Sequence, residues 1–385
     1  MAGQKKMWPV QVSSRLDAPK LGAMNFLNEI SSRFPKAISF AAGRPREANF
    51  DVAGSLDYIK DFAAHKNPAG SAQAFNFLGQ YGRTNGLICD LISKLLLTDD
   101  GISIQHDDIV VTSGCQEAMC LCVAAMCANP GDVALVADPA YVGMWGAVHV
   151  LGGEVQGVPS GPSGINLDSL EEKIEELKAE GKSVRILYVC PDHANPTGAT
   201  MPMRNRQRLL RIAAEYKIHI IEDQTYGYFG YGKRLPSLKA MAGSASVIYL
   251  GSFSKTIYPG LRIGFMTADQ VIEGTLPEIR LSDVVSKIKS FLTVNSCQLS
   301  QAIVGGLLVK HHCSLKAFVA PRVKEMKKNR DAMVSALQEY FPRDEPWTSG
   351  IGWNSPTGGY FLTLKVPFEV SEKDLLGVAP EKRTP

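Results

Sequence analysis

The segment Gly251-Ser-Phe-Ser-Lys-Thr256, followed by Gly260-Leu-Arg-Ile-Gly264, decides the fold of this chain. It places a lysine, Lys255, just after a predicted strand and among hydroxyls and glycines. Lys255 would be an amine that condenses with an aldehyde, its pKa lowered by a partly desolvated, cationic pocket. The alternative is an exposed lysine in a Ser/Gly loop. The side chains that could donate hydrogen bonds to a phosphate here are Ser252, Ser254 and Arg262.

A carboxylate ends another apolar run earlier in the chain, Ile220-Ile-Glu-Asp-Gln-Thr-Tyr226. Open α/β sheets bind their ligands at the carboxyl ends of strands, so Asp223 is a candidate partner for the pyridine nitrogen of a cofactor. Tyr226, three residues further on, could reach a ring hydroxyl. A helix cap at the strand end is the alternative interpretation of Asp223.

Further motifs lie upstream. In Val110-Val-Thr-Ser-Gly-Cys-Gln116 a strand passes through a turn of small residues into a helix, whose first N–H groups and dipole could seat an anion. The residues expected around a phosphate there are Gly114, Cys115 and Gln116. Asn195, in an Asn-Pro-Thr-Gly turn, could bond a ring oxygen, Tyr141 could stack on the ring, and Tyr81 could bond the phosphate. Each motif alone also fits an ordinary turn or a packed tyrosine.

Between about residues 85 and 265, short β-rich apolar runs alternate with segments whose apolar residues recur every three to four positions. The expected strands are 108–112, 133–137, 185–189, 219–222 and 246–250. The expected helices are 116–126, 167–180 and 206–216. This alternation is typical of a largely parallel sheet with helices on both faces. Beyond residue 320 we expect an amphipathic helix at 322–333, then a loop and a strand-like run at 359–364.

The composition is that of an ordinary globular protein. The 385 residues are 45% hydrophobic and 21% charged with a net charge of +3, so neither nucleic acid nor a membrane is expected as a partner. The N-terminus lacks the apolar core of a signal peptide, and no run approaches the about 20 apolar residues that cross a bilayer, so we expect a cytoplasmic protein. The eight cysteines form no CxxC pair, which favours reduced, buried thiols over disulfides or a metal site.

The order and spacing of these motifs resemble those of the class I/II aminotransferases, fold-type I enzymes that depend on pyridoxal 5'-phosphate (PLP). The matching segments run from about Ile38-Ser-Phe-Ala-Ala-Gly-Arg-Pro45 to Gly358-Gly-Tyr-Phe361. The resemblance implies a homodimer with shared active sites, in which Tyr81 serves the neighbouring subunit's cofactor. The family's cofactor residues then correspond to Cys115, Gln116, Tyr141, Asn195, Asp223, Tyr226, Ser252, Ser254, Lys255 and Arg262.

The resemblance also implies the architecture. We expect an α/β protein whose large domain has a mostly parallel, seven-stranded sheet flanked by helices, together with a smaller α/β domain. The large, PLP-binding domain is expected at residues 51–316. The small domain is expected at 1–50 and 317–385, with its C-terminal part incomplete.

The implied activity is transamination between an amino acid and a 2-oxo acid. Lys255 would carry PLP as a Schiff base and act as general base and acid, while Asp223 lets the ring accept negative charge and Tyr141 stacks on it. Two alternatives stay open. One is another PLP reaction on the same scaffold, such as elimination, cyclisation or oxidation; the other is a PLP-binding protein without catalytic activity or an inactive truncated product.

Substrate recognition is less clearly marked. The stretch Met24-Asn-Phe-Leu-Asn-Glu-Ile30 resembles a natural-product branch of the family that includes hydroxyphenylglycine-type aminotransferases, which implies an aromatic or otherwise unusual amino acid. The family binds the substrate's α-carboxylate with an arginine well beyond the strand at 356–361, whereas Arg383 comes too early here and sits in a terminal tail. Either the chain is a truncated version of a longer one, which we favour, or Arg44 is the anchor. The candidate substrate contacts are Gly43, Arg44 and Asn195.

Overall fold

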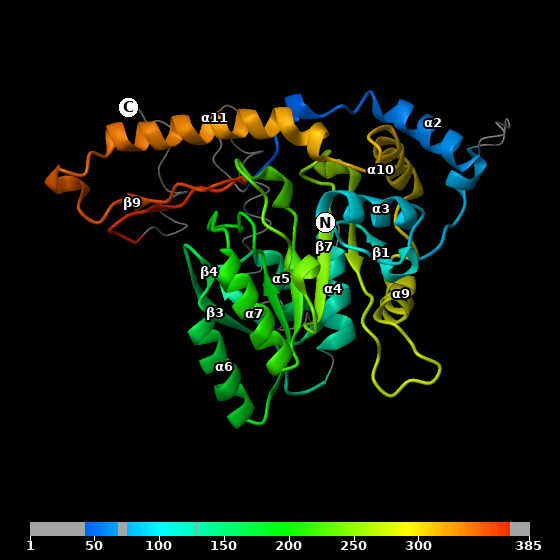
Figure 1. Ribbon diagram of the computed structural model, residues 1–385, viewed down its shortest axis with the longest axis horizontal. Helices are drawn as coiled ribbons and strands as arrows, with labels where there is room; N and C mark the ends of the chain where they lie inside the picture. Colours follow the sequence, from blue (N-terminus) through cyan, green and yellow to red (C-terminus); the bar gives the residue numbers. More distant parts are fainter. Residues whose placement is uncertain (1–42, 68–74, 128, 370–385) are drawn as a thin grey trace, which may run out of the picture.

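The computed structural model describes residues 43–67, 75–127 and 129–369 of the chain. At its centre is an eight-stranded sheet with helices on both faces. One long helix, α11 (Lys316–Tyr340), runs along one side of the molecule, beyond the end of this sheet (Figure 1).

The sheet is mostly parallel, with the strand order β1-β8-β7-β6-β5-β2-β3-β4. The strands are β1 (Ile109–Thr112), β2 (Asp132–Asp138), β3 (Glu154–Gly161), β4 (Gly164–Ile165), β5 (Ser183–Val189), β6 (His219–Asp223), β7 (Val247–Ser252) and β8 (Gly264–Thr267). The neighbours from β7 through β6, β5 and β2 to β3 are parallel, while β8 lies antiparallel between β1 and β7. Because β5, β6 and β7 are parallel, the loops that follow them leave from the same end of the sheet.

Alternate residues of the strands pack into two different cores, since successive side chains of a strand point to opposite faces. Ile220 and Val247 belong to the core beneath α6 (Leu167–Ala179), α7 (Met203–Glu215) and α8 (Leu238–Met241). Their neighbours Ile221 and Ile248 belong to the core beneath α4 (Cys115–Met126), α5 (Val142–Leu151) and α9 (Leu281–Leu292). Both faces of the central strands are therefore buried, which explains why their sequences are apolar throughout.

A third core lies beside β1 and β8. It contains α2 (Ser55–Lys66), α3 (Cys89–Asp100) and α10 (Gln298–Lys310). A Cβ at Gly306 would lie 1.8 Å from the carbonyl oxygen of Tyr58, so α10 and α2 approach each other through their backbones. Phe253 and Ile257 are buried in this core on either side of Lys255, which fixes the loop that carries the lysine.

The helix α11 spans 25 residues, of which only Val319 and Arg322 are buried, as expected for a solvated amphipathic helix. Beside it, β9 (Gly352–Trp353) and β10 (Leu364–Lys365) form a two-stranded sheet. The predicted strand at 359–364 was largely wrong, because only Leu364 belongs to a strand. A strand needs a neighbour for its N–H and C=O groups, and β9 offers only two residues. The short 3-10 helices are η3 (Glu47–Asn49), η4 (Asn76–Gly79), η5 (His106–Asp108), η6 (Gly227–Phe229), η7 (Pro259–Leu261) and η8 (Pro346–Thr348).

The strands and helices predicted between residues 85 and 265 are confirmed as β1, β2, β5, β6 and β7 and as α4, α6 and α7, with small shifts of their ends. The sheet has eight strands rather than seven, with the two-residue β4 as a hairpin partner of β3 at its edge. The division into a large and a small domain stays a prediction. Residues 24–30 and Arg383 lie outside the described residues.

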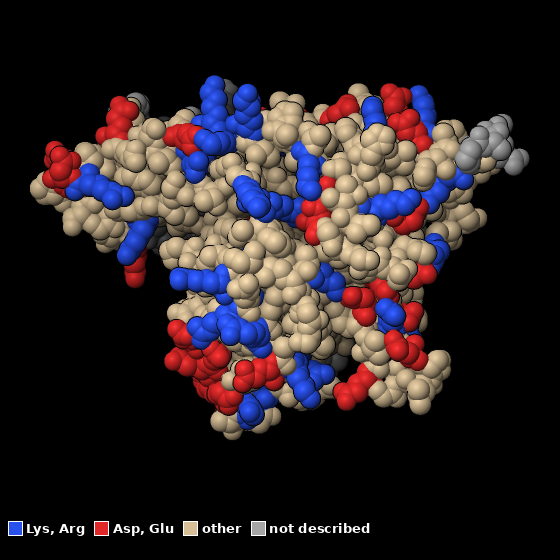
Figure 2. Space-filling model, in the orientation of Figure 1, with Lys and Arg blue, Asp and Glu red and all other residues tan. Residues whose placement is uncertain are grey.

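The cysteines and the surface charges agree with an ordinary globular protein. All eight cysteines are free thiols. On the face shown in Figure 2, basic and acidic side chains are interspersed, and both signs gather over α6 and α7. No helix in the described ranges is long and apolar enough to cross a membrane.

Candidate active site

The amine of Lys255 lies at the carboxyl end of the central strands, in the loop between β7 and β8. Its Nζ donates a hydrogen bond to the Gly43 carbonyl oxygen at 3.0 Å and lies 5.9 Å from the centre of the Tyr360 ring. Burial, and next the positive charge of Arg262, lower the pKa of this amine from 10.5 to about 8, although Asp223 acts in the opposite direction. A sizeable fraction of Lys255 is therefore uncharged and nucleophilic near pH 8.

Asp223 is the last residue of β6 and is buried. Its Oδ2 accepts a hydrogen bond from the Tyr188 hydroxyl at 2.7 Å, and its Oδ1 accepts one from the backbone N–H of Thr225 at 2.9 Å. These two donors fix the orientation of the carboxylate. Tyr188, on the neighbouring strand β5, had no role in the sequence prediction, since a tyrosine within an apolar strand looks like ordinary core.

Asn195 and Tyr226, which were both predicted to bind a ring oxygen, come together from two loops; that role stays a prediction. Asn195 Nδ2 donates to the Tyr226 hydroxyl oxygen at 3.3 Å. The Tyr226 ring packs edge-on against Phe361, with 5.3 Å between ring centres, and lies 6.0 Å from Tyr360. Burial raises the pKa of Tyr226 well above its usual value, so its hydroxyl stays protonated and can donate a hydrogen bond.

A candidate anion seat forms where the β1–α4 turn meets the loop after Lys255. Arg262 has a left-handed backbone (φ 52°), and its guanidinium donates to the Ser113 carbonyl at 3.1 Å and to the Ser254 hydroxyl at 3.5 Å. Gly114 also has positive φ (81°), and a Cβ there would lie 2.5 Å from Arg262 Nη2. The backbone N–H of Ser254 donates to Ser252 Oγ at 3.2 Å. Hydroxyls, a guanidinium and the N-terminus of α4 thus converge.

An ion pair that was not predicted from the sequence, between Glu117 and Lys289, stabilises the turn between β1 and α4. Glu117 accepts a hydrogen bond from the Ser113 N–H at 2.6 Å, and its carboxylate pairs with Lys289 on α9 at 3.0 Å. The two residues are 172 positions apart, so a single sequence gives no sign of their contact.

Tyr141 stands at the start of α5 and faces the first turn of α4. Its hydroxyl donates to Gln116 Oε1 at 3.2 Å, and Gln116 Nε2 donates to the Gly143 carbonyl at 2.8 Å. Burial raises the pKa of Tyr141 to about 12. The Cys115 thiol donates to the Gly251 carbonyl at 3.3 Å, and burial raises its pKa, so it is a neutral thiol whose contribution to an anion seat is its backbone N–H.

A groove of about 660 Å³ lies between α11 and the segment 356–364. Lys255 does not line it, but Gly43 and Tyr360, which the Lys255 amine approaches, do. The groove is lined by Gly43, Arg44, Arg46, Arg322, Met326, Met333, Tyr360, Phe361 and Leu362, among others. Gly43 has positive φ (58°) and packs against Phe361 so closely that a Cβ would lie 2.7 Å from its ring. The Arg44 side chain is 58% exposed and lies 3.8 Å from Glu47, so no firm partner holds it.

Tyr81 is the candidate that the single chain does not bring to this site. Its side chain is 79% exposed, and its backbone N–H donates to the side chain of the preceding Gln80. A contribution of Tyr81 to a neighbouring subunit's site stays a prediction.

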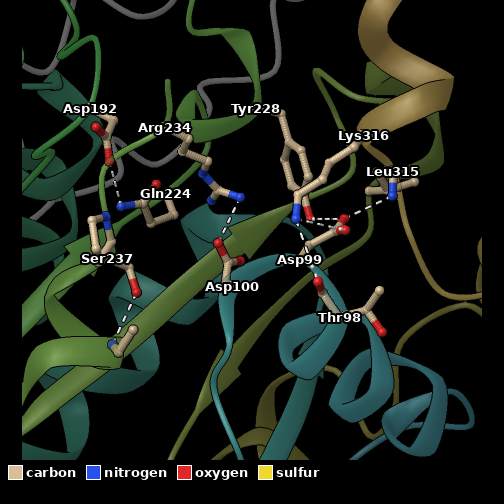
Figure 3. Close-up of polar contacts among 12 residues, drawn as sticks. Thr98, Asp99, Asp100, Asp192, Gln224, Tyr228, Arg234, Ser237, Leu315 and Lys316 are labelled. Atoms are coloured by element: carbon tan, nitrogen blue, oxygen red, sulfur yellow. Dashed lines mark hydrogen bonds and ion pairs between the residues drawn. The ribbon is translucent and has the colours of Figure 1, made fainter. Parts of the chain in front are cut away.

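Buried polar groups join the loop that carries Asn195 to the strand that ends in Asp223, and Figure 3 shows one of these contacts, between Gln224 and Asp192. Gln224 Nε2 donates to Asp192 at 2.9 Å and to Glu222 at 2.8 Å, and Asp192 also pairs with Arg206 at 2.5 Å. Burial raises the pKa of Glu222 to about 7. Gln224 thus bridges a residue that closely precedes Asn195 and the strand that ends in Asp223.

A neighbouring cluster in the same view joins α3 to the start of α11. Asp99 accepts hydrogen bonds from Tyr228 at 2.9 Å and from the N–H of Leu315 at 2.8 Å, with Lys316 at 3.6 Å (Figure 3). Next to it, Arg234 pairs with Asp100 at 2.6 Å. These contacts fix the base of α11 against the body that carries the central sheet.

Together these groups make a site with a distinct chemistry. It offers a reactive amine, a fixed carboxylate, hydrogen-bond donors for an oxygen, and a seat for a phosphate-like anion. The arrangement suits a phosphorylated aldehyde with a basic ring nitrogen.

Comparison with known proteins finds relatives along most of the chain. The model of the family "Aminotransferase class I and II" matches residues 37–376. The (S)-3,5-dihydroxyphenylglycine transaminase of Amycolatopsis orientalis is 39% identical over 367 residues, which are 94% of this chain and 82% of that protein. Aromatic-amino-acid aminotransferase 1 of Thermococcus litoralis is 33% identical, over 90% of this chain and 77% of its own. The crystal structure of Pyrococcus horikoshii kynurenine aminotransferase, in complex with PMP, superposes with a TM-score of 0.76 at 30% identity, covering 91% of this chain and 82% of that one.

Proposed function

Because the chain belongs to the class I and II aminotransferases, we propose that it binds PLP through Lys255 and transfers an amino group between an aromatic amino acid and a 2-oxo acid. That the chain is an aminotransferase follows from its family. The cofactor of this chain, the roles of its residues and its substrates are the proposal. The observation that carries it is the buried amine of Lys255, whose pKa lies near 8, close to the carboxylate of Asp223 and the guanidinium of Arg262.

The donor set fits PLP at each of its functional groups. The candidate anion seat around Arg262, the carboxylate of Asp223 and the side chains of Asn195 and Tyr226 all belong to the site of the Lys255 amine. Members of the family use this cofactor. Ser252, Ser254, Arg262 and the N–H groups from Gly114 to Gln116 would hold the phosphate. Asp223 would pair with the ring nitrogen, Asn195 and Tyr226 with the ring oxygen, and Tyr141 would cover the ring.

When bound, PLP supplies an electron sink for the negative charge that develops when the Cα–H bond of an amino acid breaks. Tyr188 and Thr225 orient the Asp223 carboxylate, which would hold a proton on the ring nitrogen of the bound cofactor. The Nζ of Lys255 would be the group that accepts the Cα proton and delivers it again nearby. Phe361 and Tyr360, which pack against Tyr226 and line the groove, would limit the access of water to this space.

The groove beside Lys255 is the proposed substrate site. Its apolar wall of Met326, Met333, Phe361 and Leu362 suits an aromatic side chain, and exposed Arg44 can meet a carboxylate at its mouth. The carbonyl of Gly43 accepts the hydrogen bond of Lys255 Nζ, so Gly43 lies between the groove and this amine. The two relatives named above, whose printed names refer to dihydroxyphenylglycine and to aromatic amino acids, support an aromatic donor.

A homodimer is part of the proposal. Large apolar side chains stay exposed on α2, on α9 and in the loop before α9, which lie toward the same side of the molecule in Figure 1. They include Leu56, Leu276, Phe291 and Leu292, of which Phe291 is 85% exposed. Exposed apolar surface of this kind marks interfaces. Exposed Tyr81 would then reach the neighbouring subunit's site. The cytoplasmic location stays a prediction from the sequence.

The test is an absorption titration of purified protein loaded with PLP. Aromatic amino acids should bleach the visible band of the bound cofactor, and a 2-oxo acid should restore it, whereas small or basic amino acids should act weakly. A band that decays with release of ammonia and is not restored by any 2-oxo acid would replace transamination with elimination. A chain that shows no band at all would contradict PLP binding.

A further inference from the structure

Arg322, near the start of α11, reaches across to the backbone of the lysine that carries the proposed function. Its Nη1 donates to the carbonyl oxygen of Lys255 at 2.7 Å and to that of Thr256 at 2.9 Å, while Nη2 donates to the carbonyl of Asn49 at 3.4 Å. The residue is 8% exposed. One guanidinium therefore joins three segments: the helix α11, the Lys255 loop and the stretch after Gly43.

The chemistry of these contacts requires an arginine. A buried cation loses its hydration and must be compensated by good acceptors, and here backbone carbonyls of the Lys255 loop provide them. One guanidinium nitrogen bonds two successive carbonyls while the other remains free to reach a third, a planar fork that a lysine ammonium cannot reproduce. Its contacts are thus directed at the peptide group that carries the reactive side chain.

Lys255 is consequently held at both ends. Arg322 fixes its carbonyl, and the Gly43 carbonyl accepts the hydrogen bond of its Nζ at 3.0 Å. Both Arg322 and Gly43 also line the groove of about 660 Å³, together with Met326 one turn along α11. The wall of the groove and the root of the reactive side chain are therefore mechanically connected.

We propose that Arg322 is a positioning residue for the amine of Lys255, and that through it α11 couples the state of the groove to this amine. The coupling to substrate rests on the proposed function, whereas the positioning of the amine can be tested without any cofactor. The expected consequence of loosening the fork is that the Lys255 side chain shifts toward solvent.

The test uses Arg322→Lys, which keeps the charge and loses the fork. The cofactor-free full chain is acetylated with trace acetic anhydride across a range of pH, and the modified peptide containing Lys255 is quantified by mass spectrometry. In the unmodified protein the reactivity midpoint should fall near pH 8. In Arg322→Lys it should rise by about one pH unit, a tenfold loss of reactive amine at pH 7, because the amine gains solvent.

The matched control is Arg330→Lys, another arginine of α11 that lines the groove and donates to a backbone carbonyl, that of Pro356, instead of Lys255. It should leave the Lys255 midpoint where it is. If Arg322→Lys does not fold, as judged by its thermal transition, Arg322→Gln keeps one donor at the same place and should raise the midpoint in the same direction.

In the loaded enzyme, Arg322→Lys should lower kcat about 10- to 100-fold with a smaller change in KM, since misplacing a proton-transfer group slows the step that uses it. A midpoint and a kcat equal to those of the unmodified protein would overturn the inference. Failure of the unmodified protein to take up PLP, combined with a shifted midpoint in Arg322→Lys, would refute the proposed function and leave the positioning role intact.

Discussion

Replacing Lys255 with methionine is expected to stabilise the cofactor-free protein at pH 7. The native environment lowers the pKa of this amine from 10.5 to about 8, so the charged form is penalised when the chain folds. At 1.36 kcal/mol per pKa unit this penalty is at most about 3 kcal/mol, and partial solvation reduces it to about 2 kcal/mol. Methionine keeps the apolar stem and loses the hydrogen bond to Gly43, which is worth about 1 kcal/mol. The net gain at pH 7 is therefore about 1 kcal/mol.

The pH dependence has a definite sign. Between about pH 8 and pH 10.5 the unfolded chain keeps a proton on Lys255 that the folded chain has lost, so the stability of the unmodified protein rises with pH in this window. The methionine variant lacks this contribution. Its advantage in the free energy of unfolding should shrink by about 1.5 kcal/mol from pH 7 to pH 10 and become a small disadvantage.

The assay is urea unfolding of both cofactor-free proteins at pH 7, 8.5 and 10, followed by circular dichroism. Taking the difference between the two proteins cancels the other titrating groups. Lys217→Met, in the loop before β6, is the control because this side chain is exposed, so its replacement should change the free energy of unfolding little. An advantage of Lys255→Met that is the same at all three pH values would refute the account of Lys255 as a desolvated amine.

Other expected outcomes concern the site and the dimer. Tyr188→Phe removes a 2.7 Å hydrogen bond to Asp223 and should cost about 1 kcal/mol of stability. It should also lower PLP affinity several-fold in an equilibrium titration. Unchanged affinity would show that the Tyr188 hydroxyl does not orient Asp223 for the cofactor. Gly114→Ala should weaken PLP binding at least tenfold, since φ is 81° and the new Cβ would lie 2.5 Å from Arg262. The control is Gly101→Ala, where φ is 67° and the space around the Cβ is open. It should lose only about 1 kcal/mol of stability to backbone strain and bind PLP normally. Mixing inactive Lys255→Ala with inactive Tyr81→Ala chains should restore activity, because one of the two sites in a mixed dimer would have both residues intact. Mixed dimers without activity would contradict a shared site.

The residues that the sequence could predict are those that follow strands. Lys255, Asp223 and Asn195 each come shortly after an apolar run, and parallel strands bring such residues to the same end of a sheet, so the positions of these three side chains follow from local pattern and sheet geometry. The alternation of Ile220 with Ile221 between two cores follows from the same geometry.

The groups that hold these residues in place could not be predicted in this way. Tyr188 lies within an apolar strand, where only its contact with Asp223 reveals a role. Arg322 acts on a carbonyl 67 positions away, and Lys289 on a carboxylate 172 positions away, so neither contact leaves a local sign. Tyr81 is exposed, and its proposed place in a neighbouring subunit's site cannot be tested with a single chain. The strand predicted at 359–364 failed because strand formation depends on a neighbour as well as on apolar residues.

The central claim is that Lys255 is the residue that binds PLP. The most direct measurement is to incubate the protein with PLP, reduce it with borohydride, digest it and locate the pyridoxyl group by mass spectrometry. The account predicts one stoichiometric modification, on the peptide that contains Ser254, Lys255 and Thr256, which is absent when excess aromatic amino acid is added first. A modification spread over surface lysines, or one that survives in Lys255→Ala at the same yield, would contradict it.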